Sequence, residues 1–328
     1  MTEVGELAAA VRAGERRAVA RAITLVESQR REDFARAESL LADLYSVLGR
    51  ERPRALRIGL TGAPGVGKST LLDALGAVAL SRSFRVGALA VDPTSRRHGG
   101  SLLGDRLRMT RLSAADAAFV RASPSGGAEG GLGRRTREAL VVLEAAGFER
   151  IFVESVGVGQ NELSLVDVAD VTVVVLMAGA GDEVQAMKRG LLEHADLVVF
   201  NKADGPRLPE AERARDELAA LFSWMRREAT PVFDVSALDD RGVPELFDAI
   251  EARFAALESS GELERRRRDQ LARWFRAAVE ERLLARLAER PEMLRVRAEL
   301  ERAVESGRIA PPLAAHQFVD PATSSGGA

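Results

Sequence analysis

The sequence predicts an α/β fold in which a doubly wound, mostly parallel sheet carries helical extensions at both ends. Between about residues 55 and 250, short apolar segments alternate with helical stretches, which is typical of such a sheet. Several of these segments are continuously apolar, as strands covered by helices on both faces should be. A glycine-rich loop also joins the first predicted strand to a helix, and this arrangement is typical of α/β domains that bind phosphate groups.

This pattern divides the chain into three parts, of which the first two are an extension and a central domain. Residues 1–50 are expected to form a helical extension, because Leu7 and Val11 begin a series of apolar residues at helical spacing. The central domain is expected over residues 51–250 and begins with a boundary segment that contains Pro53. Its predicted strands are residues 56–61, 86–91, 151–154, 171–177, 197–200 and 232–235.

The third part, residues 251–328, is expected to be a helical arm with a flexible tail. Pro291 separates two helices, and apolar residues follow a helical stripe in each. These residues are Leu271, Trp274, Phe275, Val279, Leu283, Leu284 and Leu287 in the first helix, and Met293, Val296, Leu300 and Val304 in the second. Two alternatives remain open: the first stripe packs on the domain's own core, or it forms a dimerisation arm. Arg265 to Arg268 are expected to form a solvated helix face.

Composition excludes several classes of function. The chain has 328 residues, with 47 basic and 49 acidic side chains and a net charge of −2, so charge gives no argument for a nucleic-acid partner. It has no cysteine and three histidines, which excludes disulfides and thiolate metal sites and disfavours a transition-metal site. No apolar run predicts a membrane span and no secretory signal is visible, so we expect a cytoplasmic protein without a membrane partner.

The glycine-rich loop fits the pattern G-x-x-x-x-G-K-[ST], in which backbone N–H groups surround phosphate oxygens. A helix N-terminus directly behind the loop adds partial positive charge. Lys68 is expected to reach the β- and γ-phosphates as a catalytic residue, and the Ser69 hydroxyl is expected to bind Mg²⁺. The predicted phosphate-binding residues are Gly62, Ala63, Pro64, Gly65, Val66, Gly67, Lys68, Ser69 and Thr70.

A second motif identifies the base as guanine. Asn201-Lys202-Ala203-Asp204 follows a predicted strand and fits the N-K-x-D pattern of guanine-binding proteins. A carboxylate at Asp204 can accept from both guanine donors, N1–H and the N2 amine, and adenine would leave it unpaired. The aliphatic stem of Lys202 can lie along the base plane. A third segment, Ser236-Ala237-Leu238, resembles the loop that offers a backbone N–H to guanine O6.

Two further segments are expected to sense the γ-phosphate. In the first, Asp92 ends a predicted strand where a Mg²⁺-directed carboxylate belongs, and Asp105 is a second candidate ligand. In the second, Glu154 is expected to hold Mg²⁺, and the Gly157 N–H can bond the γ-phosphate, so hydrolysis would release this loop. Gln160 lies near this glycine but does not follow it directly, where small GTPases carry their water-orienting glutamine.

Taken together, these motifs resemble the MeaB/ArgK-type GTPases of the G3E class, which are chaperones of adenosylcobalamin-dependent acyl-CoA mutases. The likeness covers roughly residues 15–290. The matching stretches are Gly62–Thr70, Val91–Ser95 with Gly99–Asp105, Glu154–Gln160, Gly179–Gln185 and Asn201–Asp204. The chain departs from the family pattern at His98, Ser155 and Asn161, and the stretch after about residue 305 matches poorly.

The resemblance implies a GTP-hydrolysing switch that gates adenosylcobalamin loading and protects or reactivates a mutase partner, and it implies a homodimer. It also implies Mg²⁺ held by Ser69 with Asp92, Asp105 and Glu154 in different nucleotide states. A third loop, about residues 177–190, would couple nucleotide state to the mutase through Asp182, Glu183 and above all Lys188.

Turnover is expected to be slow without the partner, because no glutamine follows Gly157 and no arginine finger is evident, although Arg108 is a candidate. The cofactors are therefore expected to be GTP or GDP with Mg²⁺. Three rivals remain. A nickel-insertion metallochaperone GTPase is disfavoured by the lack of cysteine, and an ATP-dependent kinase or transport ATPase by the guanine motif. A pure binding scaffold with a vestigial site is disfavoured by the intact Lys68, Ser69, Asp92 and Glu154.

Overall fold

The computed structural model describes residues 2–28, 30–46, 48, 55–92, 109–124, 134–155, 165–179, 192–224, 230–288 and 291–319. These residues fall into two compact units, Met1–Gln270 and Leu271–Ala328, which are described separately. The first unit contains the sheet and every motif that the sequence singled out, and the second is helical.

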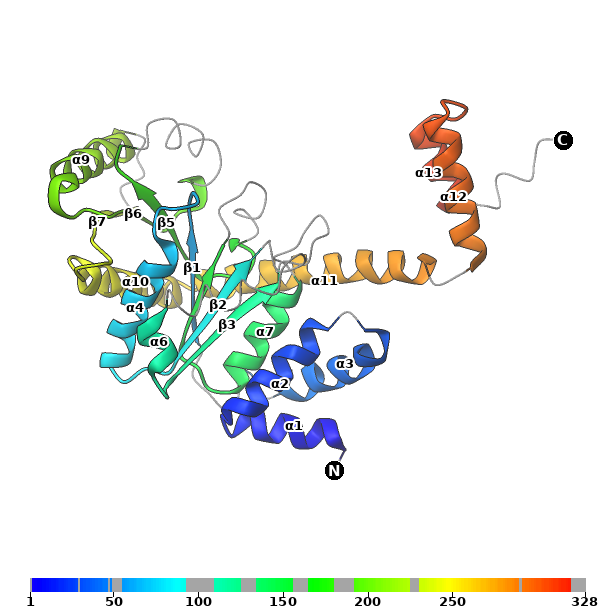
Figure 1. Ribbon diagram of the computed structural model, residues 1–328, viewed down its shortest axis with the longest axis horizontal. Coiled ribbons are helices and arrows are strands. Elements are labelled where there is room, and N and C mark those ends of the chain that lie inside the picture. Colours follow the sequence, from blue (N-terminus) through cyan, green and yellow to red (C-terminus); the bar gives the residue numbers. More distant parts are fainter. Residues whose placement is uncertain are drawn as a thin grey trace. The chain divides into compact units, whose positions relative to one another are not determined.

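The first unit is built on seven parallel strands (Figure 1), which confirms the predicted α/β class. Their order across the sheet is β3-β2-β4-β1-β5-β6-β7, and every pairing between them is parallel. The strands are β1 (Leu56–Thr61), β2 (Val86–Asp92), β3 (Ala118–Pro124), β4 (Arg150–Glu154), β5 (Val171–Met177), β6 (Leu197–Asn201) and β7 (Val232–Asp234).

Helices cover both faces of the sheet, which explains the continuously apolar strands. In β5, Val173 and Val175 belong to one core cluster, while Val174 and Leu176 belong to another on the opposite face. The first cluster includes residues of α4 and α10, and the second includes residues of α9. The helical elements of this part are α4 (Lys68–Ser81), α6 (Thr110–Ala114), α7 (Arg134–Ala145), η3 (Leu192–His194), η4 (Gly205–Arg207), α9 (Leu208–Trp224) and α10 (Val243–Ser259).

The sequence analysis did not predict β3, and its position in the sheet explains why. β3 lies at an edge, carries the charged Arg121 at its centre and ends at Pro124, which edge strands tolerate. Arg121 donates to the Glu27 carboxylate in the N-terminal helices at 2.6 Å. An edge strand with an ion pair lacks the continuous apolar pattern by which the central strands were predicted.

Three helices precede the sheet, as expected for the N-terminal extension. They are α1 (Glu3–Arg12), α2 (Arg16–Glu27) and α3 (Arg31–Tyr45), and α2 and α3 pack against α7. Val19 and Ile23 of α2 are fully buried, so the apolar face of this extension belongs to the core of the first unit.

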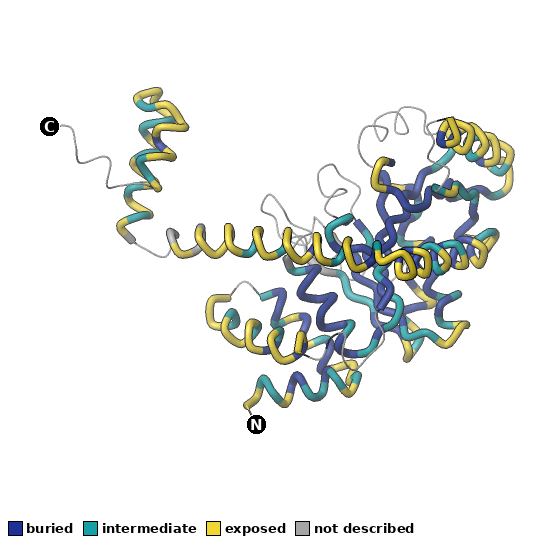
Figure 2. Tube along the Cα trace, turned by 180° about the vertical axis from the view of Figure 1, so that it is seen from behind, coloured by how far each residue is buried: buried dark blue, intermediate teal, exposed yellow. Residues whose placement is uncertain are grey.

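The chain ends with α11 (Glu262–Ala288), α12 (Pro291–Glu305) and α13 (Pro311–Val319). Figure 2 shows that α11 is largely exposed beyond its first turns. Leu271, Phe275, Val279 and Leu283, four apart on this helix, are among the exposed large apolar residues. Along the described chain, no helix is both long and apolar enough to cross a membrane.

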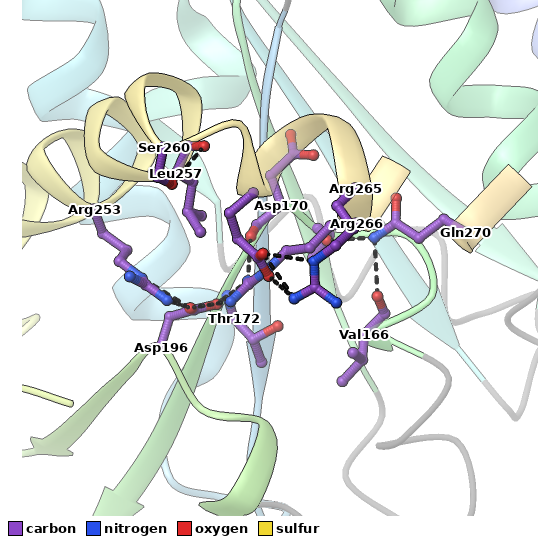
Figure 3. Close-up of polar contacts among 12 residues, drawn as sticks. Val166, Asp170, Thr172, Asp196, Arg253, Leu257, Ser260, Arg265, Arg266 and Gln270 are labelled. Carbon is purple, nitrogen blue, oxygen red and sulfur yellow. Dashed lines mark hydrogen bonds and ion pairs between the residues drawn. The ribbon is translucent and has the colours of Figure 1, made fainter. Parts of the chain in front are cut away.

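The first turns of α11 are held by buried acidic residues, so the expected solvated face at Arg265–Arg268 is wrong for two of its members (Figure 3). Arg267 donates to both carboxylate oxygens of Asp170, at 2.8 and 2.7 Å, just before β5. Arg266 donates to both oxygens of Asp196, at 3.0 Å each, just before β6. Burial opposes charge on Arg266, but Asp196 and Glu262 together outweigh it, so the pKa of that guanidinium is raised.

Candidate nucleotide-binding site

The glycine-rich loop, Glu154 and Asn201 lie at one edge of the sheet, because the parallel strands that lead to them all end there (Figure 1). β1 ends at Thr61 and leads into the glycine-rich loop, which is followed by α4. β4, beside β1, ends at Glu154, and β6 ends at Asn201. In an open α/β sheet this edge is where ligands bind, so its side chains define the candidate site.

The glycines of the loop occupy conformations that other residues rarely adopt. Gly62 has φ +150°, and a Cβ there would lie 2.0 Å from the Val175 carbonyl oxygen. Gly67 has φ +91°, and a Cβ there would lie 2.6 Å from Nδ2 of Asn201. Gly62 therefore allows close approach to the backbone of β5, and Gly67 allows close approach to the Asn201 side chain, so both positions favour glycine. Gly65, with φ +83°, faces open space.

Lys68 and Ser69 open α4, with the Lys68 side chain directed into the loop and the Ser69 side chain directed to Glu154. The buried Lys68 ammonium donates to the carbonyl oxygens of Gly62 and Ala63, at 2.8 and 3.0 Å. A phosphate bound in the loop would have to share or replace these bonds. The Ser69 hydroxyl donates to Oε1 of Glu154 at 2.8 Å, so residues 85 positions apart in the sequence meet here. Thr70 follows in the first turn of α4.

The oxygen atoms of Ser69 and Glu154 suit a hard cation. Mg²⁺ commonly takes one or two protein carboxylates together with waters and phosphate oxygens, so a full cage of side chains is not required. Among the described residues, no group of three or more His, Cys, Asp or Glu side chains could hold a metal. Asp92 ends β2, next to β4, and its side chain lies outside the described atoms. The pair that is described therefore fits a Mg²⁺ shared with a nucleotide.

Asn201 connects the glycine-rich loop to the segment after β7. Its side chain is buried, and Nδ2 donates to the carbonyl oxygens of Val66 at 2.9 Å and Gly67 at 3.3 Å. Its Oδ1 accepts from the Ala237 N–H at 3.2 Å. This asparagine thus fixes the phosphate loop and the proposed base loop relative to one another.

Lys202 and Asp204, the two predicted base-binding residues after β6, contact the glycine-rich loop and the segment after β7, respectively. Lys202 has φ +60°, rare for a residue with a side chain, and its ammonium donates to the Gly65 carbonyl at 2.6 Å. Its stem therefore runs from the base loop to the phosphate loop. Oδ2 of Asp204 accepts from the buried Ser236 hydroxyl at 2.9 Å, and Leu238 stands exposed in the same loop as Ser236. Pro64 is exposed on the opposite loop.

Sequence reasoning missed a set of charged residues behind this loop. Arg241 donates to the Ala203 carbonyl oxygen through Nε at 3.2 Å and Nη2 at 2.7 Å, and Nη2 also donates to Asp234 at 2.9 Å. Asp234 is paired with Arg215 as well. Asp216 and then Asp234 raise the pKa of Arg215, against the opposite effect of burial. No local pattern signals these contacts, because Ala203 follows β6, Arg215 lies on α9, and Asp234 and Arg241 lie at the end of β7 and after it.

A hydroxyl pair at the ends of β1 and β4 was also missed. Ser155, one of the departures from the family pattern, donates to Oγ1 of Thr61 at 3.0 Å, and both residues are fully buried. The bond ties the residue after Glu154 to the start of the phosphate loop.

The remaining predicted site residues lie outside the described residues, so their roles stay predictions. They are Asp105, Arg108, Gly157, Gln160, Asp182, Glu183 and Lys188.

A parallel sheet with a G-x-x-x-x-G-K-[ST] loop after β1 and an N-K-x-D loop after β6 defines a P-loop GTPase. The chain belongs to the family described as "Methylmalonyl Co-A mutase-associated GTPase MeaB", whose model matches residues 19–292. This confirms the resemblance inferred from the motifs.

Individual relatives agree with this assignment. The chain is 46% identical over 321 residues to a probable GTPase of Mycobacterium tuberculosis, covering 97% of this chain and 94% of the relative. It is 39% identical over 305 residues to GTPase ArgK of Escherichia coli, covering 92% and 91%. It is 36% identical over 312 residues to the mitochondrial methylmalonic aciduria type A homolog of Mus musculus, covering 92% and 75%.

A solved structure with a similar fold is described as LAO/AO transport system kinase. It matches 98% of this chain and 99% of its own, with a TM-score of 0.71 and 31% identity. The chain is thus a GTP-hydrolysing enzyme of the P-loop class.

Proposed function

We propose that this GTPase is a nucleotide-dependent switch that serves an adenosylcobalamin-dependent acyl-CoA mutase, gating delivery of the cofactor and protecting or reactivating the mutase. The observation that carries the proposal is a P-loop, a Ser69–Glu154 pair and an N-K-x-D loop held together by hydrogen bonds, in a chain of a mutase-associated family. Relatives named for methylmalonic aciduria support the same partner class.

The described residues suggest how phosphoryl transfer would be assisted. Lys68 is placed to exchange the carbonyls of Gly62 and Ala63 for phosphate oxygens. The N–H groups of the loop and of the first turn of α4 would stabilise charge on the same oxygens. When bound, Mg²⁺ would neutralise charge on the β- and γ-phosphates. Ser69 and Glu154 would hold it, with Asp92 and Asp105 as further proposed ligands.

The partner would supply what the chain lacks. Gly157 and Gln160 form the proposed γ-phosphate sensor, and Asp182, Glu183 and Lys188 form the proposed mutase-coupling loop. Because no glutamine directly follows the sensor glycine, hydrolysis by the isolated chain should be slow. We propose that mutase binding accelerates it, with Arg108 as a candidate for a charge-stabilising arginine.

The apolar face of α11 supports self-association. Leu271, Phe275 and Leu283 are 43%, 70% and 58% exposed, at spacings that place them on one side of the helix. A continuous exposed apolar stripe on a charged helix is unusual for a surface in contact with water alone. We propose that this stripe is buried by a second copy of the chain in a homodimer.

The test is GTP hydrolysis measured with and without an isolated cobalamin-dependent mutase. Methylmalonyl-, ethylmalonyl-, isobutyryl- and hydroxyisobutyryl-CoA mutases should each be tried. The expected result is a rate increase with one of them, coupled to transfer of adenosylcobalamin, and loss of both effects in Lys68→Ala. An unchanged rate across the whole panel would contradict the proposal.

A further inference from the structure

We propose that Arg241 is a positioning residue for guanine recognition, which fixes the peptide between Ala203 and Asp204 and thereby presets the Asp204 carboxylate. The inference rests on the proposed guanine site and adds a residue that the N-K-x-D pattern does not contain. It predicts that Arg241 affects the choice of base more than it affects binding of the phosphates.

The contacts of Arg241 link two loops. Its guanidinium donates twice to the Ala203 carbonyl oxygen, at 2.7 and 3.2 Å, and once to Asp234, at 2.9 Å. Its own carbonyl accepts from the Ser236 N–H at 3.0 Å. The side chain thus joins the base-reading loop after β6 to the loop that carries Ser236, with Asp234 holding the guanidinium in place.

The peptide that Arg241 bonds follows a residue in an unfavourable backbone conformation. Lys202, just before Ala203, is in the left-handed region with φ +60°, a conformation that costs free energy for a residue with a side chain. Ala203 is fully buried, and its N–H donates to the Val235 carbonyl at 3.0 Å. Arg241 bonds the carbonyl oxygen of the same residue. The backbone from which the Asp204 carboxylate projects is therefore held on both sides.

The carboxylate itself is oriented by a separate bond. Oδ2 of Asp204 accepts from the Ser236 hydroxyl at 2.9 Å, and Ser236 belongs to the loop that Arg241 ties down. Loss of the Arg241 side chain would loosen the backbone of Asp204, whereas the bond from the Ser236 N–H to the backbone carbonyl of residue 241 would remain. Hydrogen bonds from guanine to this carboxylate depend on that backbone, whereas the side-chain bonds described for the phosphate loop do not involve Arg241.

Arg215 provides a matched control. It pairs with the same Asp234, and its side chain is exposed to a similar extent, 34% against 40% for Arg241. Among the contacts of the described residues, Arg215 bonds Asp216 and Asp234 and makes none to Ala203. Removing Arg215 therefore perturbs the same ion-pair cluster and leaves the Ala203 carbonyl bonded.

The experiment is calorimetric titration of the full chain with GDP, IDP and ADP. IDP lacks the N2 amine of guanine, so the ratio of GDP to IDP affinity reports the bond from that amine to Asp204. Wild type should prefer GDP about tenfold or more. In Arg241→Met this ratio should fall at least about fivefold, and IDP, which keeps the N1–H bond to Asp204, should lose less affinity than GDP. Arg215→Met should keep the wild-type ratio. Arg241→Lys keeps the positive charge and should give a ratio between those of wild type and Arg241→Met. It also tests the proposal if Arg241→Met does not fold.

Two results would overturn the role of Arg241: an unchanged GDP to IDP ratio in both of its variants, or an equal fall in Arg215→Met. Failure of the guanine site itself looks different. In that case wild type would bind ADP as tightly as GDP, or Asp204→Ala would keep the preference for GDP over IDP.

Discussion

Asn201 offers a sharp test of how the site is assembled, because one buried amide joins three segments. Replacing it by alanine removes the acceptor of the Ala237 N–H and the donor to the Val66 carbonyl. Asn201 is only 2% exposed, so water cannot replace the hydrogen bonds that its side chain makes to these two partners.

The expected size follows from those two bonds. Each polar group left unsatisfied in a buried site costs about 1–3 kcal/mol, so Asn201→Ala should lower the free energy of unfolding by about 2–6 kcal/mol. For a chain of this size, each kcal/mol lowers Tm by about 2 °C, which gives a decrease of about 4–12 °C. The bond to Gly67, at 3.3 Å, is longer and is left out of this sum.

Asn201→Asp distinguishes this account from a simple loss of volume. Aspartate keeps an acceptor for the Ala237 N–H but places an oxygen where Nδ2 donates to the Val66 carbonyl. Oxygen facing oxygen in a buried site is repulsive, so this variant should be at least as unstable as Asn201→Ala.

Thermal unfolding without nucleotide, followed by circular dichroism, measures both variants. GDP affinity should fall in both as well, because the phosphate loop and base loop are no longer tied. An Asn201→Asp protein with the Tm of wild type would refute the reasoning, since it would show that the amide donor contributes nothing.

Three further predictions concern other parts of the molecule. Gly62→Ala should abolish measurable GDP binding in calorimetry, because its Cβ would lie 2.0 Å from the Val175 carbonyl oxygen at φ +150°. Asp170→Asn should lower the free energy of unfolding by about 3–5 kcal/mol in denaturant titration, because it leaves Arg267 beside a neutral group in a buried site. Phe275→Glu should shift the molar mass in light scattering from dimer to monomer while leaving Tm of the first unit unchanged, because this ring is 70% exposed.

A control variant or a contradicting outcome accompanies each of these predictions. Gly65→Ala shares the positive φ of Gly62→Ala but places its Cβ in open space, so it should weaken GDP binding less, and equal loss in both glycine variants would argue against the steric reason. Asp248→Asn removes an exposed ion pair with Arg82 and should leave stability nearly unchanged; if it costs as much as Asp170→Asn, burial is not the cause. A Phe275→Glu protein that is still dimeric would remove this face from the proposed interface.

The sequence predicted those parts of the site whose signal is local. The P-loop is read within one strand–loop–helix unit, and Asn201-Lys202-Ala203-Asp204 directly follows its strand, so motif and context lie side by side in the chain. Parallel strands then bring the motifs to one edge without further information. The sheet was predicted for the same reason wherever two-sided burial left an apolar run.

What the sequence did not predict depends on contacts between distant residues. Arg267 bonds Asp170, which lies 97 positions away in the sequence. From the sequence alone, the basic run that contains Arg267 cannot be distinguished from a run of solvent-exposed arginines. Arg241 meets Ala203 across 38 positions on another loop. β3 was missed because an edge strand with Arg121 at its centre carries no apolar run.

The choice of base by Asp204 tests the central claim most directly. Calorimetry should compare GDP with XDP, in which an oxo group replaces the N2 amine, on wild type and on Asp204→Asn. Wild type should prefer GDP, because its carboxylate accepts from the amine, and Asp204→Asn should prefer XDP, because an amide can donate to the oxo group. The same order of affinities in both proteins would contradict a guanine site built on this residue.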